Sequence, residues 1–154
     1  MKRTIESLNG LSFSLPVGYK VVREKYFSQN DMGLFHKENY VSKDMKVISF
    51  FEINQNADLF LEKYGNLTCD KQNDGENQEV KKQVSLNIDG RDFTAFVIKT
   101  FHQKLIYIFQ VFVKCDDGLG CFMINLDRWN DDIVQLAKDN QLLDDLLSVL
   151  RSIK

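Results

Sequence analysis

Apolar side chains fill nearly every position between Leu105 and Val113, with β-branched and aromatic residues dominating the run. An extended strand of this composition has two apolar faces, which predicts a central strand over residues 105–115 with cover on both sides. The run contains no proline, so at a sheet edge it would pair with other chains and aggregate. We therefore expect neighbouring strands on either side of it.

The segments around this run alternate between apolar and polar residues. Residues 84–88 and 93–101 flank the turn Asp89-Gly90, and residues 121–126 follow a short loop at 116–120. Period-two alternation bounded by turn residues is typical of hairpins. The pattern predicts a four-stranded antiparallel meander over residues 84–126.

The first third of the chain also predicts strands. Residues 3–8 and 11–15 flank Asn9-Gly10, a hairpin turn signal, and Pro16 then ends the pairing. The further strands expected are residues 19–27, whose charges make the strand exposed or irregular, and an antiparallel pair formed by residues 33–37 and 46–53.

Two helical regions are predicted. Asn56 is a suitable cap for a short helix that ends at Gly65. Residues 127–154 predict helix, with Asp127 or Asn130 as its cap and a break at Asp139-Asn140. Its leucines recur at i, i+3 and i+4, so we expect them to pack across the meander as core.

The polar segment at residues 70–80 is predicted to be a mobile loop. It superficially resembles a calcium loop, but Gln72 and Lys81 stand where that loop needs an oxygen ligand and a bidentate glutamate.

Length and charge narrow the function classes. The chain has 154 residues, enough for one ordinary core, so we expect a single domain over residues 1–154. Its 20 basic and 22 acidic residues leave a net charge of −2, which disfavours a nucleic-acid partner. No run approaches the ~20 apolar residues of a membrane span, and no secretory signal follows Met1. A cytoplasmic location is expected.

Catalytic signatures are missing from the sequence. His36 and His102 belong to no HExxH motif, no serine lies in a GxSxG elbow, and no glycine-rich phosphate loop is present. We therefore expect no catalytic residue, no metal site and no cofactor, although carboxylates from separate strands can converge without a linear motif. Cys115 and Cys121 flank one turn; we interpret them as reduced strand residues, with a redox pair as the alternative.

The order of elements resembles the Mog1/PsbP-like superfamily, which includes the DcrB-like bacterial proteins. The similarity rests on residues 11–19 (LSFSLPVGY), the strands of residues 84–126 and the closing helix that ends at residues 150–154. Tyr19 stands where the family usually carries tryptophan. The resemblance implies an α+β fold, an α/β/α sandwich in which an antiparallel sheet of about six strands is flanked by helices.

The resemblance also implies binding rather than catalysis. Members act as cofactors of a small GTPase, as photosystem subunits, or as chaperones and adaptors for secreted effectors. They share no catalytic residues, so none is carried over to this chain. Our leading hypothesis is thus a non-enzymatic module that binds another polypeptide as an adaptor or chaperone-like protein.

The predicted partner site is an apolar groove on a partly covered sheet face. Its expected lining comprises Phe96, Ile98, Tyr107, Phe109 and Val111. The alternative is that all five belong to the core, which charge substitutions at Tyr107 and Phe109 distinguish. The alternative function is an enzyme or small-ligand protein that uses His36, His102 or scattered carboxylates in an unrecognised pocket. Homodimerisation is compatible with either function.

Overall fold

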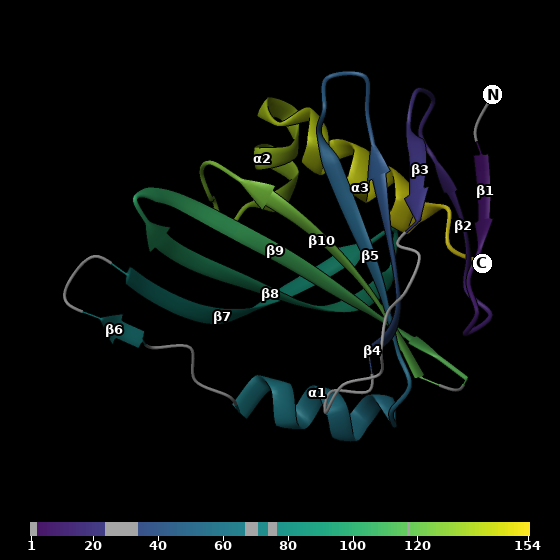
Figure 1. Ribbon diagram of the computed structural model, residues 1–154, viewed down its shortest axis with the longest axis horizontal. Coiled ribbons are helices and arrows are strands. Elements are labelled where there is room, and N and C mark those ends of the chain that lie inside the picture. Colours follow the sequence, from purple (N-terminus) through teal and green to yellow (C-terminus); the bar gives the residue numbers. More distant parts are fainter. Residues whose placement is uncertain (1–2, 24–33, 67–70, 74–76, 117) are drawn as a thin grey trace.

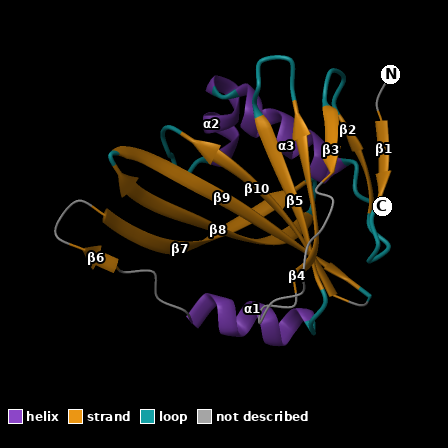
Figure 2. Cartoon of the chain, viewed as in Figure 1, coloured by secondary structure: helices purple, strands orange, loops and turns teal. Residues whose placement is uncertain are grey.

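The computed structural model describes residues 3–23, 34–66, 71–73, 77–116 and 118–154. An eight-stranded antiparallel sheet, in the order β3-β4-β5-β10-β9-β8-β7-β6, has helices on both faces, and β1 and β2 form a separate two-stranded sheet (Figures 1 and 2). This arrangement confirms the predicted α+β sandwich, with more strands than the six or so expected. The elements are β1 Arg3–Glu6, β2 Ser12–Leu15, β3 Lys20–Arg23, β4 Leu34–Val41, β5 Val47–Ile53, α1 Ala57–Asn66, β6 Lys71–Asn73, β7 Asn77–Ile88, β8 Arg91–His102, β9 Lys104–Cys115, β10 Gly118–Leu126, α2 Ile133–Asp139 and α3 Gln141–Arg151.

The predicted meander is confirmed, and β9 lies inside the sheet between β10 and β8. The loop predicted at residues 70–80 is wrong where the structure describes it. Residues 71–73 form the edge strand β6, and β7 begins at Asn77. β6 pairs with β7 through backbone hydrogen bonds, and its sequence is polar. An apolar pattern therefore could not predict this strand. The other residues of the predicted loop, Asp70 and residues 74–76, lie outside the described residues.

The amino-terminal hairpin is confirmed, and it closes one side of the core. β1 and β2 pair across the Asn9-Gly10 turn. Phe13 in β2 is 1 % exposed, and its ring centroid lies 5.1 Å from that of Phe50 and 5.0 Å from that of Phe122. The pairing of β4 with β5 is also confirmed. The strand predicted at residues 19–27 appears as β3, and its final residues lie outside the described part.

Helix boundaries follow the capping residues closely. The Asn56 side chain accepts a hydrogen bond from the Leu59 amide at 3.1 Å, so the predicted cap of α1 is confirmed, whereas Gly65 lies inside the helix. The break at Asn140 is confirmed as well. The predicted cap of α2 is wrong: Asp132 caps it, accepting from the Gln135 amide, and the Asn130 side chain instead accepts from the Asp132 amide.

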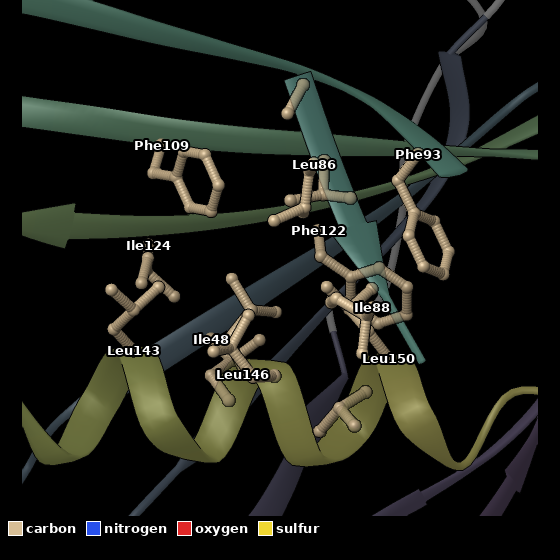
Figure 3. Packing of buried hydrophobic residues seen from close by; sticks show 14 of the residues in the cluster. Ile48, Leu86, Ile88, Phe93, Phe109, Phe122, Ile124, Leu143, Leu146 and Leu150 are labelled. Atoms are coloured by element: carbon tan, nitrogen blue, oxygen red, sulfur yellow. The ribbon is translucent and has the colours of Figure 1, made fainter. Parts of the chain in front are cut away.

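Apolar side chains pack on both faces of the sheet. The larger cluster joins the sheet to α2, α3 and the β1–β2 hairpin, and Figure 3 shows Leu143, Leu146 and Leu150 of α3 directed at the strands. The smaller cluster lies under α1 and contains Ile53, Phe60, Phe96, Phe112, Leu119 and Cys121. Because side chains alternate between faces, odd-numbered residues of β9 such as Phe109 face α3 and even-numbered ones such as Phe112 face α1.

The two cysteines that flank the β9–β10 turn lie on opposite faces of the sheet. Cys115 packs against the larger cluster and Cys121 belongs to the smaller one, and both are free thiols. The alternative of a redox pair is therefore wrong. Within the described ranges, no helix is long and apolar enough to span a membrane.

Candidate functional site

The cover over β8 and β9 ends before the turn that joins them. Phe109 and Val111 are 0 % exposed, but all four residues from Leu105 to Ile108 are partly exposed. Phe101, near the end of β8, is 41 % exposed. We call residues 98–101 and 105–108 the open end of the sheet. The cover predicted for both faces of this strand is thus found only from Phe109 onward.

Strand register fixes which face each side chain of the open end occupies. Ile98 pairs with Ile108 and Thr100 with Ile106, and these residues alternate with those that face α3. They therefore lie on the face that carries α1. Tyr107 lies on the opposite face, where it packs against the larger cluster.

The five residues predicted to line one groove do not share a surface. Phe96 and Ile98 lie on the α1 face, whereas Tyr107, Phe109 and Val111 lie on the α3 face. Phe96, Phe109 and Val111 are also buried, at 2 %, 0 % and 0 % exposure. The predicted groove is therefore wrong as one surface, and only Ile98 and Tyr107 are partly exposed.

A register argument would have separated these residues. The turn at residues 102–104 is centred on Gln103, which has a positive φ of 69°. A turn centred there pairs even-numbered residues of β8 with even-numbered residues of β9. Ile98 therefore pairs with Ile108, so the residues to group with it were Ile106 and Ile108, which the sequence prediction missed.

Helix α1 covers only part of its face of the sheet. Phe60 packs on Phe112, with ring centroids 5.9 Å apart, and Tyr64 packs between Phe112 and Phe96. The Tyr64 hydroxyl donates to the Gln110 side chain at 2.5 Å. Beside the helix is a shallow apolar groove of about 150 Å³, lined by Phe51, Ile53, Phe60, Gln110, Phe112, Cys121 and Met123.

Partly exposed apolar residues continue from this groove toward the open end. Ile98, Ile106, Ile108 and Met123 lie on the α1 face, and we call them the apolar strip. Met123 pairs with Gln110 at the groove, and Ile108 lies two residues further along β9. The strip is thus a continuation of the surface on which α1 packs.

Two lysines, Lys81 and Lys104, lie on the α1 face beside this strip. A cross-strand row on the α1 face runs through Asn125, Ile108, Ile98 and Lys81. Lys81 lies 4.2 Å from the Tyr64 ring centroid and donates to the Tyr64 carbonyl. Lys104, also on this face, precedes Ile106 by two residues. Lys81 ends this row, and the adjacent row runs from Ile106 through Thr100 to Glu79.

A larger polar cleft of about 780 Å³ adjoins the strip at Ile106, and Asn125 also lines it. Its charged lining is mixed, with Lys43, Lys46, Lys104, Arg128, Asp44, Asp127, Asp139 and Asp145. Tyr19 donates to the Asp145 carboxylate at 2.7 Å. Burial and this carboxylate raise the pKa of the Tyr19 phenol, so the hydroxyl remains a donor and ties residue 19 to α3.

A second polar cluster lies among buried strand residues. Glu52 is 0 % exposed, and its carboxylate lies 2.7 Å from Nδ1 of His36. Nε2 of the same ring lies 3.4 Å from Oε1 of Glu38. Two carboxylates from different strands thus converge on one histidine, an arrangement without a linear motif.

The surroundings of Glu52 give this cluster a structural role. Its Oε1 accepts the Asn9 amide at 2.9 Å, and the Asn9 side chain donates to the carbonyls of Ile53 and Leu119, each at 3.3 Å. The carboxylate therefore pins the β1–β2 turn to the sheet. Among the residues that the structure describes, no three His, Cys, Asp or Glu are grouped as a metal would require. The side chain of His102 lies outside that part.

Comparison with known proteins identifies the fold. No protein-family model matches the chain, and no curated protein matches it. Among solved structures, the chain is similar to cyanobacterial PsbP (CyanoP) from Synechocystis sp. PCC 6803, whose solution structure superposes with a TM-score of 0.59 at 15% sequence identity. The match covers 99% of this chain and 91% of that one. Identity this low carries the fold alone, and on that ground the chain has the Mog1/PsbP-like fold that residues 11–19 and the closing helix indicate.

Proposed function

We propose that the protein is a non-enzymatic module that binds another polypeptide, and that the partner docks on the apolar strip. The observation that carries the proposal is the contrast along β9, where Ile106 and Ile108 remain partly exposed while Phe109 and Val111 are fully buried. Apolar residues grouped on one open face are typical of interaction surfaces. The fold is compatible with this role.

The finer assignments belong to the same proposal. We propose that the module acts as an adaptor or chaperone-like protein. We also propose that it is related to the DcrB-like proteins and that it is located in the cytoplasm. A nucleic-acid partner is disfavoured by the net charge of −2.

The test is affinity capture from native extract with three baits: the wild-type chain, Ile108→Asp and Val134→Asp. Val134 is 65% exposed on α2, so its substitution controls for a surface carboxylate elsewhere. We expect one dominant partner that is captured by wild type and by Val134→Asp and is lost with Ile108→Asp. Equal capture by all three baits, or capture of none, would contradict the proposal.

Ile108 is a better probe than Phe109 because it is partly exposed. A carboxylate at Phe109 would replace a ring that is 0 % exposed and lies 5.3 Å from the Trp129 ring, so the variant would unfold. Circular dichroism and urea unfolding of each bait verify that Ile108→Asp keeps the fold.

The polar cleft favours the alternative of a small-ligand site, because it is large and lined by both lysines and aspartates. A thermal-shift screen of small acids, bases and nucleotides distinguishes the two. A ligand that raises the melting temperature of wild type but not of Lys46→Ala and Asp127→Ala variants would favour the cleft over the strip.

A further inference from the structure

We infer that the outer edge of β7 is a second binding site, which takes up an extended polypeptide segment as an added strand. The edge borders a groove between β7 and the two carboxyl-terminal helices. This groove lies on the α3 face, whereas the apolar strip lies on the α1 face, so the two sites are separate. Three features support the site: the open edge, the groove beside it, and the lack of guarding residues along it.

Most of β7 has no neighbouring strand on its outer side. β6 pairs only with residues 77–79 of β7, and in the described part of the chain no other strand pairs with this edge. Residues 80–88 therefore form an open edge. Such an edge presents unpaired backbone N–H and C=O groups, to which another extended chain can bind.

The turn between β7 and β8 determines which backbone groups point outward. Asp89 and Gly90 both have positive φ, 54° and 85°, as in a two-residue type I′ hairpin, in which Ile88 and Arg91 exchange both backbone hydrogen bonds. Because such pairs alternate, even-numbered residues of β7 bond to β8 and odd-numbered residues direct their N–H and C=O groups outward. The outward residues are 81, 83, 85 and 87. They repeat about every 7 Å, a spacing that an extended chain matches and a helix does not.

A groove of about 280 Å³ runs beside this edge. It is lined by residues 85–89 of β7 and its turn, by residues 131–134 at the start of α2, and by Leu147 and Arg151 of α3. An added strand directs every second side chain to the α3 face, and these side chains would enter the groove. The groove therefore supplies side-chain contacts next to the backbone contacts of the edge.

The residues around the groove indicate which sequence the bound segment carries. Leu86 and Ile88 lie on the side of β7 that faces α3 (Figure 3), and Val134 on α2 is 65 % exposed. Apolar side chains of the segment would cover these residues. Ser85 and Asn87 lie on the opposite face, where they are exposed. The segment should therefore alternate between apolar and polar residues.

Charged residues guard the ends of the open edge but not its middle. Lys81 and Lys82 precede residues 83–88, and Asp89 follows them, but residues 83–88 contain no charged residue, proline or glycine. Their pairing with β8 continues without a bulge. Charges, prolines and bulges are the usual protection of an edge strand against pairing. Their absence from residues 83–88 favours an edge that another strand pairs with.

A second copy of the chain fits this edge less well than a short segment does. Two β7 strands paired around a two-fold axis keep the α3 faces of both copies on the same side. Each copy would then bring its residues 131–134 toward the groove of the other. Asp131 and Asp132 of the two copies would repel one another there.

A display selection with random ten-residue peptides tests the site. The baits are wild type and two pairs of variants. Ser85→Pro removes an outward N–H but no bond to β8, a change that an edge strand tolerates, and Ser85→Ala controls for the lost hydroxyl. Val134→Asp places a carboxylate at the rim of the groove. Its matched control is Leu59→Asp, because Leu59 is 67 % exposed on α1.

We expect wild type and both control variants to enrich peptides with apolar residues at alternate positions. Ser85→Pro and Val134→Asp should each bind an enriched peptide at least about tenfold more weakly. N-methylation of the synthetic peptide at one set of alternate residues should abolish binding, because those N–H groups face β7. N-methylation at the other set should leave binding unchanged, because those groups face solvent.

Amide hydrogen exchange reports on the edge directly. In the free protein, the amides of residues 83, 85 and 87 should exchange faster than those of residues 84 and 86, which bond to β8. A bound peptide should slow the exchange of the three outward amides. Equal protection of both sets in the free protein would overturn the open edge.

Other outcomes of the selection would also overturn the added strand. These are no enrichment by wild type, equal binding to wild type and to both Ser85→Pro and Val134→Asp, and binding that survives both sets of N-methylation. A dimer seen by light scattering and lost in Ser85→Pro would overturn it in favour of a second copy. If circular dichroism shows that Ser85→Pro does not fold, Val134→Asp and the N-methylated peptides decide. None of these results depends on Ile108, so the proposed function is tested separately.

Discussion

At the scale of single residues, neighbours in the sequence have opposite environments. Ile108 is partly exposed on the α1 face, and Phe109 is fully buried under Trp129 on the other. The difference arises because a strand turns each successive side chain to the other face. Side chains chosen for apolar character alone therefore mix core residues with surface ones, as Phe96 and Tyr107 illustrate.

The same alternation governs the thiols. Burial raises the pKa of both Cys115 and Cys121, and Cys121 is the more deeply buried, at 4 % exposure. Because only the thiolate reacts, we expect iodoacetamide to modify Cys115 slowly at pH 8 and Cys121 more slowly still. Mass spectrometry of the native protein measures both rates, and unfolded protein in denaturant provides the fast reference.

The direction of the pH effect follows from the raised pKa values. The folded state favours the neutral thiols, so their contribution to stability is present below the ordinary thiol pKa and is lost as the pH rises above it. Alkylation of the folded protein should accelerate over the same pH range. Modification of Cys121 at the same rate as Cys115 would mean that the smaller cluster, which lies under α1, opens readily.

At the scale of elements, the sequence predicted best those strands whose structure itself requires a particular side-chain pattern. Alternation and turn residues located the meander, because one buried face and a hairpin turn each require particular residues. Residues 71–73 lacked that signal, since β6 is held by backbone pairing at the sheet edge. The α2 cap was assigned to Asp127 or Asn130 rather than Asp132 because several adjacent residues are all suitable caps.

The candidate site was less predictable than its strands. Each of the five apolar residues chosen does lie in β8 or β9, but how far α1, α2 and α3 cover those strands depends on packing between distant elements. The pairing of Glu52 with His36 and the Asn9 amide depends in the same way on contacts across 16 and 43 positions of sequence. The alternation of apolar and polar residues within one segment does not predict such long-range contacts.

Two glycines in different elements predict opposite effects of the same substitution. A Cβ at Gly120 in β10 would lie 2.9 Å from the Phe50 ring and 3.3 Å from Leu11, whereas one at Gly65 in α1 would meet nothing closer than 3.8 Å. We expect Gly120→Ala to lower the free energy of unfolding by about 1–3 kcal/mol through overpacking. Gly65→Ala should raise it by up to about 1 kcal/mol through helix propensity.

Urea unfolding of the two glycine variants against wild type provides the measurement. A Gly120→Ala variant as stable as wild type would mean that the hairpin and β5 yield at little cost.

At the scale of the whole molecule, the amino-terminal hairpin and the carboxyl-terminal helix close the core together. Leu15 is 0 % exposed, the Ser14 amide donates to the Ser152 hydroxyl at 2.7 Å, and the Lys154 amide donates to the Ser12 carbonyl at 3.0 Å. Figure 1 shows the two ends of the chain on the same side of the molecule. The larger cluster therefore depends on residues from both ends.

Removing residues 1–15 should therefore abolish folding rather than trim an appendage. The shortened chain, residues 16–154, would lose Phe13 and Leu15 from the larger cluster, and we expect it to show poor amide dispersion in NMR spectra. Adding a synthetic peptide of residues 1–15 should restore dispersion, with a Phe13→Ala peptide as the weaker control. A well-dispersed spectrum without the peptide would show that the hairpin is dispensable.

The hydrogen bond between Ser14 and Ser152 also has a consequence for folding during synthesis of the chain. A ribosome adds about 5–20 residues per second, so the hairpin emerges on the order of ten seconds before its partners in α3 exist. During that interval Phe13 and Leu15 have no permanent place to bury, and the nascent chain presents them to whatever is nearby. We therefore expect the yield of folded protein to depend on translation speed and on chaperones at the ribosomal tunnel exit. This dependence should be stronger than for a fold whose core is completed by segments close together in the sequence.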